Sequence, residues 1–168
     1  MRDLTAKSLK LNRDIARMLP EAMEKDRLIK IGYGAGGDLK PRTGEFGVIT
    51  HLPPKSRVLI LGELGECVGG MNRGGSLTLE GGCGSMLGAF QRSGRAVVER
   101  DVGDRAGFHM SGGTITVHGS AGREAGAGMT GGSLVVRGHV GDNVGAGMTG
   151  GTVIVMGSAG PNPGIGIR

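Results

Sequence analysis

Apolar and polar residues alternate through the second part of the chain in a pattern that repeats with a period of 19. The aligned segments begin, without a gap, at Arg57, Ser76, Arg95, Thr114, Ser133 and Thr152. In each segment, apolar residues two positions apart share one face, as in a half-buried strand. These pairs are Val58 and Ile60, Leu77 and Leu79, Ile115 and Val117, Leu134 and Val136, and Val153 and Val155. The pattern predicts one short strand per repeat.

Further apolar columns keep the same period. They are Leu64, Cys83, Val102, Ala121, Val140 and Ala159; Val68, Leu87, Ala106, Ala125, Val144 and Pro163; and the shorter stack Met110, Met129 and Met148. A coil this small cannot bury its apolar face alone, so neighbouring coils must cover it. We therefore predict an all-β fold, a single-stranded parallel β-helix of about six 19-residue coils. The spacing alone does not set its handedness.

Glycine marks the corners of the predicted coils. Three columns are Gly in every copy they reach: Gly65, Gly84, Gly103, Gly122, Gly141 and Gly160; Gly69, Gly88, Gly107, Gly126, Gly145 and Gly164; and Gly75, Gly94, Gly113, Gly132 and Gly151. Glycine accepts positive φ and close backbone approach, which tight corners require. Only 2% of the chain is aromatic, and small interior side chains suit such a narrow coil.

Residues 1–56 have a different pattern. An apolar helix face is formed by Leu4, Leu9, Leu11, Ile15, Met18 and Leu19. Pro20 either ends this helix or starts a second short turn through Met23. We predict that the helix caps the open end of the solenoid, that Leu28 to Ile31 form a strand, and that residues 32–47 form a Gly-rich loop leading to Val48 and Ile49. The domain organisation expected is a capping helix and lead-in segment over 1–56 and the β-helix over 57–168.

The charge of +5 is concentrated in the first segment, since residues 1–56 carry +4 and residues 57–168 only +1. The regular part lacks the basic stripe and aromatic platforms that nucleic-acid binding needs. A local group of arginines, opposite Glu99, Asp101 and Asp104, is formed by Arg92, Arg95, Arg100 and Arg105. It is either a solvated, mutually neutralising face or a docking surface for a partner subunit.

No apolar run approaches the length of about 20 residues that a membrane-spanning helix needs, so we expect no membrane association. Two cysteines, Cys67 and Cys83, and the lack of a leader pattern favour a reduced cytoplasmic protein without a disulfide.

The chain offers no convincing catalytic motif. Gly32 to Gly37 matches the dinucleotide fingerprint GxGxxG, but the following residues do not begin the helix that this fingerprint needs. No His or Cys pair has metal-ligand spacing, and the four histidines occupy different columns of the repeat: His51, His109, His118 and His139. No nucleophile elbow is present. We therefore assign no catalytic, cofactor-binding or metal-binding residue.

The repeated corners, such as Gly126 to Gly132 and its unchanged copy Gly145 to Gly151, resemble the GXGXG domain. That domain closes the large subunit of glutamate synthase and also forms one of the subunits of formylmethanofuran dehydrogenase. The resemblance covers residues 57–168, and Leu11 to Ile15 resembles the lead-in of archaeal-type glutamate synthase chains, whose large subunit is split. It implies a right-handed β-helix that holds an amidotransferase and an FMN and iron–sulfur subunit apart in glutamine-dependent amination of 2-oxoglutarate.

The chain departs from the full enzyme, because position 2 is Arg2 rather than a nucleophilic Cys and two cysteines cannot ligate a cluster. We expect FMN and the cluster on partner subunits and a non-catalytic role here. Three alternatives stay open: the GXGXG subunit of formylmethanofuran dehydrogenase, the small subunit of an N-methylglutamate synthase, and a free-standing self-associating structural protein whose last coil has no obvious cap.

Overall fold

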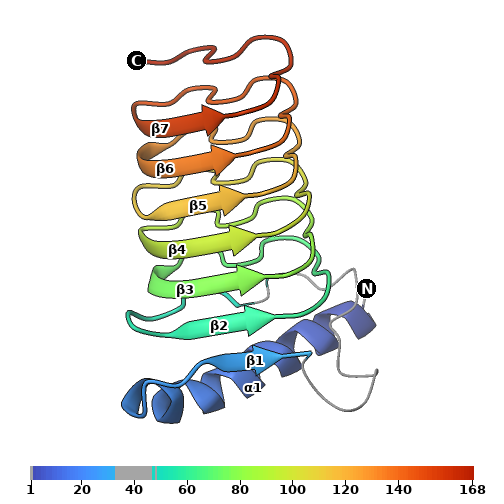
Figure 1. Cartoon of the computed structure of the whole chain (residues 1–168), viewed down its shortest axis with the longest axis vertical. Coiled ribbons are helices and arrows are strands. Elements are labelled where there is room, and N and C mark those ends of the chain that lie inside the picture. Colours follow the sequence, from blue (N-terminus) through green and yellow to red (C-terminus); the bar gives the residue numbers. More distant parts are fainter. Residues whose placement is uncertain (1, 33–46, 48) are drawn as a thin grey trace.

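The fold is a stack of parallel strands with one helix at its lower end (Figure 1). The computed structural model describes residues 2–32, 47 and 49–168. Its elements, in chain order, are α1 (Arg2–Glu24), β1 (Ile29–Ile31), β2 (Arg57–Ile60), β3 (Arg73–Leu79), β4 (Ser93–Val98), β5 (Thr114–Val117), β6 (Thr130–Val136) and β7 (Gly150–Val155). All seven strands form one parallel sheet in the order β1 to β7.

The register with period 19 is confirmed by the strand pairing. Arg57 pairs with Ser76, and Thr114 pairs with Ser133. Five such steps link β2 to β7, so the winding completes about five turns. A second ladder of parallel bridges runs along the predicted column from Leu64 to Ala159. In Figure 1 the strands on the near face run from left to right and each later coil lies higher, which is a right-handed winding.

The interior is filled by the predicted apolar columns. Leu77, Ile115 and Leu134 are fully buried, as are Met110 and Met129. The last coil is the exception, because no further coil is stacked on it. Its Val153 and Val155 are only half-buried, and Pro163, predicted to continue an interior column, is exposed.

Two kinds of corner glycine occur. Gly126 has φ +74 and Gly145 has φ +67, a region that glycine enters without steric cost. Gly122 has no such φ, but a Cβ there would run into Asp104 Oδ1 of the coil below. The columns therefore serve both purposes that the sequence suggested, and in the third column Gly132 combines them, with φ +83 and a Cβ that would lie 2.9 Å from the backbone of Gly112.

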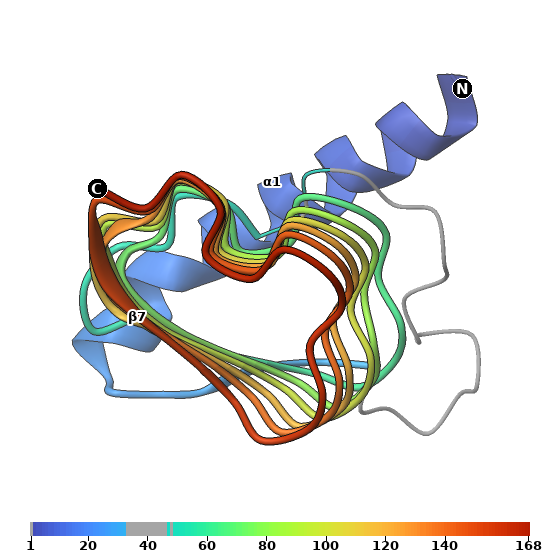
Figure 2. The same ribbon diagram turned by 90° about the horizontal axis from the view of Figure 1, so that it is seen from above.

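Helix α1 lies across the β1 end of the stack (Figures 1 and 2). Its Ile15 is only 4% exposed and belongs to the same core as the strands. The first alternative at Pro20, that the proline ends the helix, is wrong, since α1 continues to Glu24 with the proline inside it. Leu19 and Ala22 pack against the core, and this packing holds the turn around Pro20.

The winding begins before Arg57. β1, predicted as a strand at Leu28 to Ile31, pairs with β2 through Ile29 and Val58, a wider separation than the period of the repeat. Gly47 N donates to Glu66 O at 2.8 Å, and His51 N donates to Gly70 O at 3.0 Å. These segments form a partial coil beneath the regular ones. Residues 33–46 and Val48, including most of the GxGxxG match and the predicted loop, lie outside the described residues, and the division at 56/57 stays a prediction.

Candidate functional site

The histidines of the described residues are spread over the surface. His118 Nδ1 lies 2.6 Å from Glu99 Oε2, and His139 Nδ1 lies 2.7 Å from Ser158 Oγ. Both contacts join equivalent positions in neighbouring coils. Within the part of the chain that the structure describes, no three His, Cys, Asp or Glu side chains gather as a metal site would require.

The two thiols are poor nucleophiles. Burial raises the pKa of the Cys83 thiol from its usual 9.0 to about 12. Partial burial and the nearby carboxylate of Glu66 raise the pKa of Cys67. A thiolate is the reactive form, and both shifts suppress it near neutral pH. Both cysteines are free, and Cys67 Sγ lies 3.8 Å from Met86 Sδ.

The two interpretations of the arginine group, a mutually neutralising face or a docking surface, both stay open in the structure. The carboxylate of Glu124, and to a smaller extent that of Asp104, raises the pKa of the Arg105 guanidinium. Of its four members, only Arg105 has an ion pair with a described residue, through Nε to Glu124 Oε2 at 2.6 Å. The acids also contact the next coil. Asp101 Oδ1 accepts from Ser120 N at 2.7 Å, and Asp104 Oδ1 accepts from Arg123 N at 2.8 Å.

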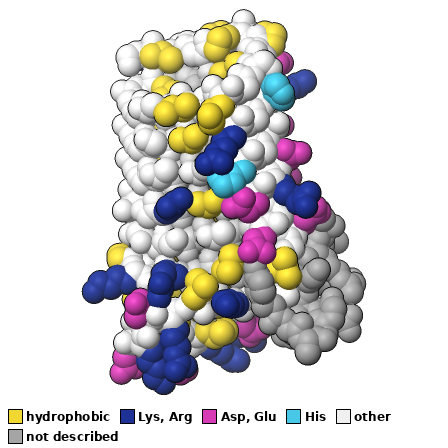
Figure 3. Space-filling model, in the orientation of Figure 1, with side chains coloured by type: hydrophobic (Ala, Val, Ile, Leu, Met, Phe, Trp, Pro, Cys, Tyr) yellow, Lys and Arg dark blue, Asp and Glu magenta, His cyan; other side chains and the backbone are white. Residues whose placement is uncertain are grey.

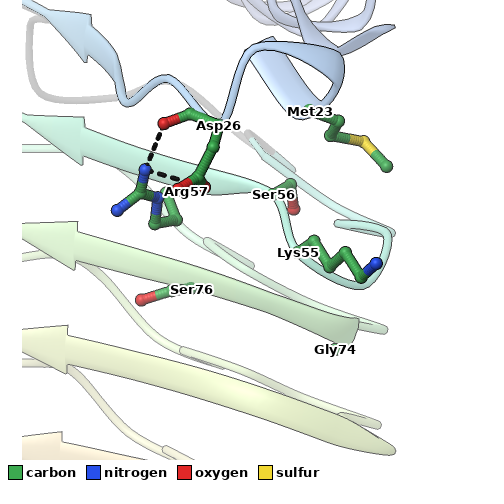
Figure 4. Close-up of a pocket in the computed structure, with 7 residues that line it drawn as sticks. All are labelled: Met23, Asp26, Lys55, Ser56, Arg57, Gly74 and Ser76. Carbon is green, nitrogen blue, oxygen red and sulfur yellow. Dashed lines mark hydrogen bonds and ion pairs between the residues drawn. The ribbon is translucent and has the colours of Figure 1, made fainter.

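A surface hollow of about 490 Å³ lies where α1 meets the first coils (Figure 4). Its central contact is Arg57 Nη2 to Asp26 Oδ1 at 3.0 Å. Figure 4 shows Lys55 extending away from this pair. The carboxylate and the guanidinium neutralise each other, so the charge that the hollow offers a ligand is that of Lys55, which has no ion pair with a described residue. Figure 3 shows Lys and Arg gathered at this end of the visible face, while the upper coils are mostly uncharged.

Most residues with positive φ that are not glycine, all except Asp26, Ile49 and Lys55, form two columns on the outside of one corner. The first contains Cys67, Met86, Arg105, Glu124, Asn143 and Asn162, with φ between 56 and 64°. The second contains His51, Met71, Phe90 and His109, followed by Gly128, Gly147 and Gly166. The backbone N–H of the second column donates to the coil above, as in Phe90 to Phe108 O and Gly128 to Ala146 O. We call His51, Met71, Phe90 and His109 the outer ridge.

The outer ridge is apolar, aromatic and exposed. Met71 is 41% exposed and Phe90 is 46% exposed. The rings of Phe90 and His109 stack with centroids 5.7 Å apart and planes 4° apart. The ring of Phe108 meets the His109 ring edge-on at 4.3 Å, and the Arg105 guanidinium lies 5.7 Å from the Phe108 centroid. This surface was not predicted from the sequence. Its signal was the replacement of Gly by bulky residues in a column that otherwise repeats Gly128 and Gly147.

The Gly-rich corners and the stacked strands are the features on which a comparison with known families can rest. Residues 91–162 match the family model of the GXGXG motif. The GXGXG match contains the two identical corners Gly126 to Gly132 and Gly145 to Gly151. The resemblance predicted over residues 57–168 is thereby confirmed for 91–162, and for residues 57–90 it stays a prediction.

Neither the curated proteins nor the solved structures yielded a match to the chain. Over the described residues, no helix is both long and apolar enough to cross a membrane.

Proposed function

We propose that this chain is a non-catalytic scaffold subunit or domain of a glutamate synthase. It positions a separate amidotransferase subunit and an FMN and iron–sulfur subunit during glutamine-dependent amination of 2-oxoglutarate. The observation that carries the proposal is the GXGXG match over residues 91–162, a motif that occurs in the glutamate synthase large subunit.

The physical character of the chain supports a scaffold. Parallel pairing continues from β1 to β7 and along the Leu64 to Ala159 ladder, so neighbouring coils are held together on more than one side. Packed interiors resist deformation, and a rigid rod can keep two partners at a fixed separation. The raised pKa values of Cys67 and Cys83 also argue against thiol chemistry in this chain.

Reconstitution tests the proposal. The full chain is co-expressed with the amidotransferase and FMN subunits, and glutamate formation is measured with glutamine and, separately, with ammonia. We expect the glutamine-dependent reaction to need this chain, because the chain couples the amidotransferase to the FMN subunit. The FMN subunit should use added ammonia without this chain. Glutamine hydrolysis or stoichiometric FMN binding by the purified chain alone would overturn the assignment.

Two further assignments are alternatives within the same proposal: the GXGXG subunit of formylmethanofuran dehydrogenase and the small subunit of an N-methylglutamate synthase. Purification of the tagged chain from its source separates the three. A tungsten or molybdenum pterin subunit in the purified complex would favour the first of these alternatives over glutamate synthase.

A self-associating structural protein is the candidate from another class. It is favoured by the apolar side chains that the coil after β7 exposes, with Ile165 at 55% and Ile167 at 58%. An apolar hollow of about 380 Å³ beside them reaches Val144 and Met148. Light scattering over a wide range of concentrations decides this point, because a strict monomer would remove the candidate.

A further inference from the structure

We propose that the outer ridge is the docking surface for a partner protein that presents an apolar side chain next to carboxylates. The inference deepens the proposed scaffold function and rests on it, since a scaffold must hold its partners through its outer surface. It assigns the contact to Met71, Phe90 and His109, with Arg73 and Arg92 as its charged border.

The fold does not need side chains on this column. Gly128 and Gly147 occupy the same position in later coils, with φ +67 and +65°. Met71, Phe90 and His109 adopt nearly the same conformation, with φ 55, 57 and 50°. For these residues the left-handed conformation costs free energy that glycine avoids. The earlier coils therefore have bulky residues at a position where the later coils have glycine, which adopts this conformation at a lower free energy.

Positive φ alone does not identify the surface, because the first outer column contains no glycine at all. Along the rod, however, the first column also changes towards residues that tolerate positive φ. Its last two members are Asn143 and Asn162, and Asn tolerates the left-handed region better than most residues. The costly residues are thus confined to the earlier coils in both columns, which is expected if that part of the corner has a role besides folding.

The exposed groups are of the kind that protein interfaces use. The chain has three Phe and no Trp, and two of those Phe residues, Phe90 and Phe108, lie at the ridge with their ring centroids 5.8 Å apart. Aromatic residues, Met and Arg are enriched at the centres of protein interfaces. Phe90 remains 46% exposed even though His109 stacks on it, so much of its surface is left for a partner.

Two arginines supply the charge. Arg73 and Arg92 follow Met71 and Phe90 by two positions and are one period of 19 apart in the sequence, although the register shift in β3 pairs Arg73 with Ser93, the neighbour of Arg92. The same sequence position recurs at Arg168, the terminus labelled C in Figure 2. Both side chains belong to exposed residues. No carboxylate of the described residues forms an ion pair with either guanidinium. By contrast, the guanidinium of Arg105, which lies over the Phe108 ring, already forms an ion pair with Glu124.

The difference between the unpaired Arg73 and Arg92 and the paired Arg105 indicates which groups a partner must present. An apolar side chain placed against Phe90 would bring its neighbours over Arg73 and Arg92, where carboxylates form favourable bidentate contacts. A second copy of this chain is a poorer fit, because the chain carries a net charge of +5 and several of its carboxylates, those of Glu99, Asp101, Asp104 and Glu124, already contact the neighbouring coil. Single-stranded nucleic acid would use aromatic rings, but it also needs a continuous basic groove, and only two unpaired arginines border the ridge.

The test uses the full chain and the co-expressed amidotransferase and FMN subunits, with dissociation constants measured by calorimetry. The first variant, F90G/H109G, installs the residue that the chain itself uses at Gly128 and Gly147. We expect it to weaken binding by at least about 30-fold, as for loss of an interface hot spot. Its melting temperature should stay within about 5 °C of the wild type, because relief of the left-handed conformation offsets the lost ring contacts.

A charge variant and two matched controls complete the set. Arg92→Glu should weaken binding by about tenfold or more and reduce its salt dependence, because it places a carboxylate where the partner's carboxylates lie. Arg95→Glu is its control, with the same charge change on an exposed arginine in another column. Ile154→Thr removes a 48% exposed apolar side chain from β7. Both controls should stay within about threefold of the wild type, as for positions outside an interface centre.

The outcomes separate the two proposals. If the partners bind the wild type and both ridge variants equally well, the docking surface is wrong and the scaffold function stands. If neither partner binds the wild type, both are overturned. Loss of a dimer in light scattering on F90G/H109G, or loss of binding to a labelled single-stranded oligonucleotide, would replace the partner protein by a second copy or a nucleic acid. If F90G/H109G unfolds, Arg92→Glu against Arg95→Glu decides the question.

Discussion

Gln91→Met should stabilise the protein, because Gln91 is the one buried side chain in the described part of the chain whose polar atom lacks a partner. Gln91 is fully buried, and its Oε1 forms no hydrogen bond with a described residue. Its Nε2 donates only at long distance, to Gly94 O at 3.2 Å and to Thr114 O at 3.4 Å. In the next two coils, the same interior position is occupied by fully buried Met110 and Met129.

The magnitude follows from the groups that change. A buried acceptor without a partner costs about 1–3 kcal/mol, and the two long hydrogen bonds return about 1 kcal/mol at most. Methionine is similar in shape and keeps the apolar contacts. We expect a net gain of about 1–2 kcal/mol, or roughly 2–8 °C in melting temperature for a chain of this size. Urea unfolding followed by circular dichroism should show a higher midpoint with an unchanged slope.

Asn72→Met is the matched control, because Asn72 precedes Gln91 in the same column and both of its side-chain polar atoms form hydrogen bonds. Its Oδ1 accepts from Gly74 N at 3.0 Å and Gly75 N at 2.9 Å, while Nδ2 donates to Gly75 O at 2.9 Å. Methionine would orphan these backbone groups, so we expect a loss of about 2–4 kcal/mol. Destabilisation of Gln91→Met by more than about 1 kcal/mol, at an unchanged slope, would refute the reasoning and indicate a buried water on Oε1.

Three further predictions concern single contacts. Gly131→Ala should cost clearly more than Gly147→Ala in urea unfolding, because its Cβ would lie 2.5 Å from Ser111 O, whereas Gly147 has open space and only the φ strain of about 1–2 kcal/mol. Cys83 should lower the free energy of unfolding as the pH rises above 9.0 towards about 12, because its thiol ionises at lower pH in the unfolded chain than in the folded one. The variant Cys83→Ala should remove this loss of stability, which thermal unfolding at about pH 8 and at about pH 10.5 would measure. A double-mutant cycle on the exposed pair Arg105 and Glu124 should give a coupling below about 1 kcal/mol.

The sequence was sufficient for the regular part of the fold. A gapless period of 19 with apolar alternation leaves few structures other than stacked parallel strands, and the register of Val58, Leu77 and Ile115 follows directly. β1 was harder to place. It pairs with β2 through Ile29 and Val58, which are separated by more than one period, so the repeat contains no signal for the pairing. The helix likewise continues past Pro20 because tertiary packing of Leu19 and Ala22 outweighs the local preference.

The outer ridge could not be predicted from the backbone preferences of its residues, because those preferences disfavour the conformation that the ridge adopts. Phe90 and Met71 disfavour positive φ, and only the hydrogen bonds between coils impose it, as when Phe90 N donates to Phe108 O at 2.8 Å. Counting charges within one coil also missed part of the surroundings of the arginine group. In a parallel stack the equivalent position of the next coil is a near neighbour of every acid, so Asp104 accepts a hydrogen bond from Arg123 N besides its electrostatic interaction with Arg105 of its own coil.

The same geometry determines how a binding surface can be built on this fold. Surface contacts such as Arg105 to Glu124 and His139 to Ser158 join positions one coil apart, so a continuous surface must use one column in consecutive coils. The ridge does so and then stops, because a Cβ at Gly128 would lie 2.7 Å from the His109 ring. A side chain at position 128 would therefore have to displace His109 from its stack on Phe90. The end of the ridge is set by this contact, which places the proposed interface on the coils nearest α1 and leaves the later coils free for another partner.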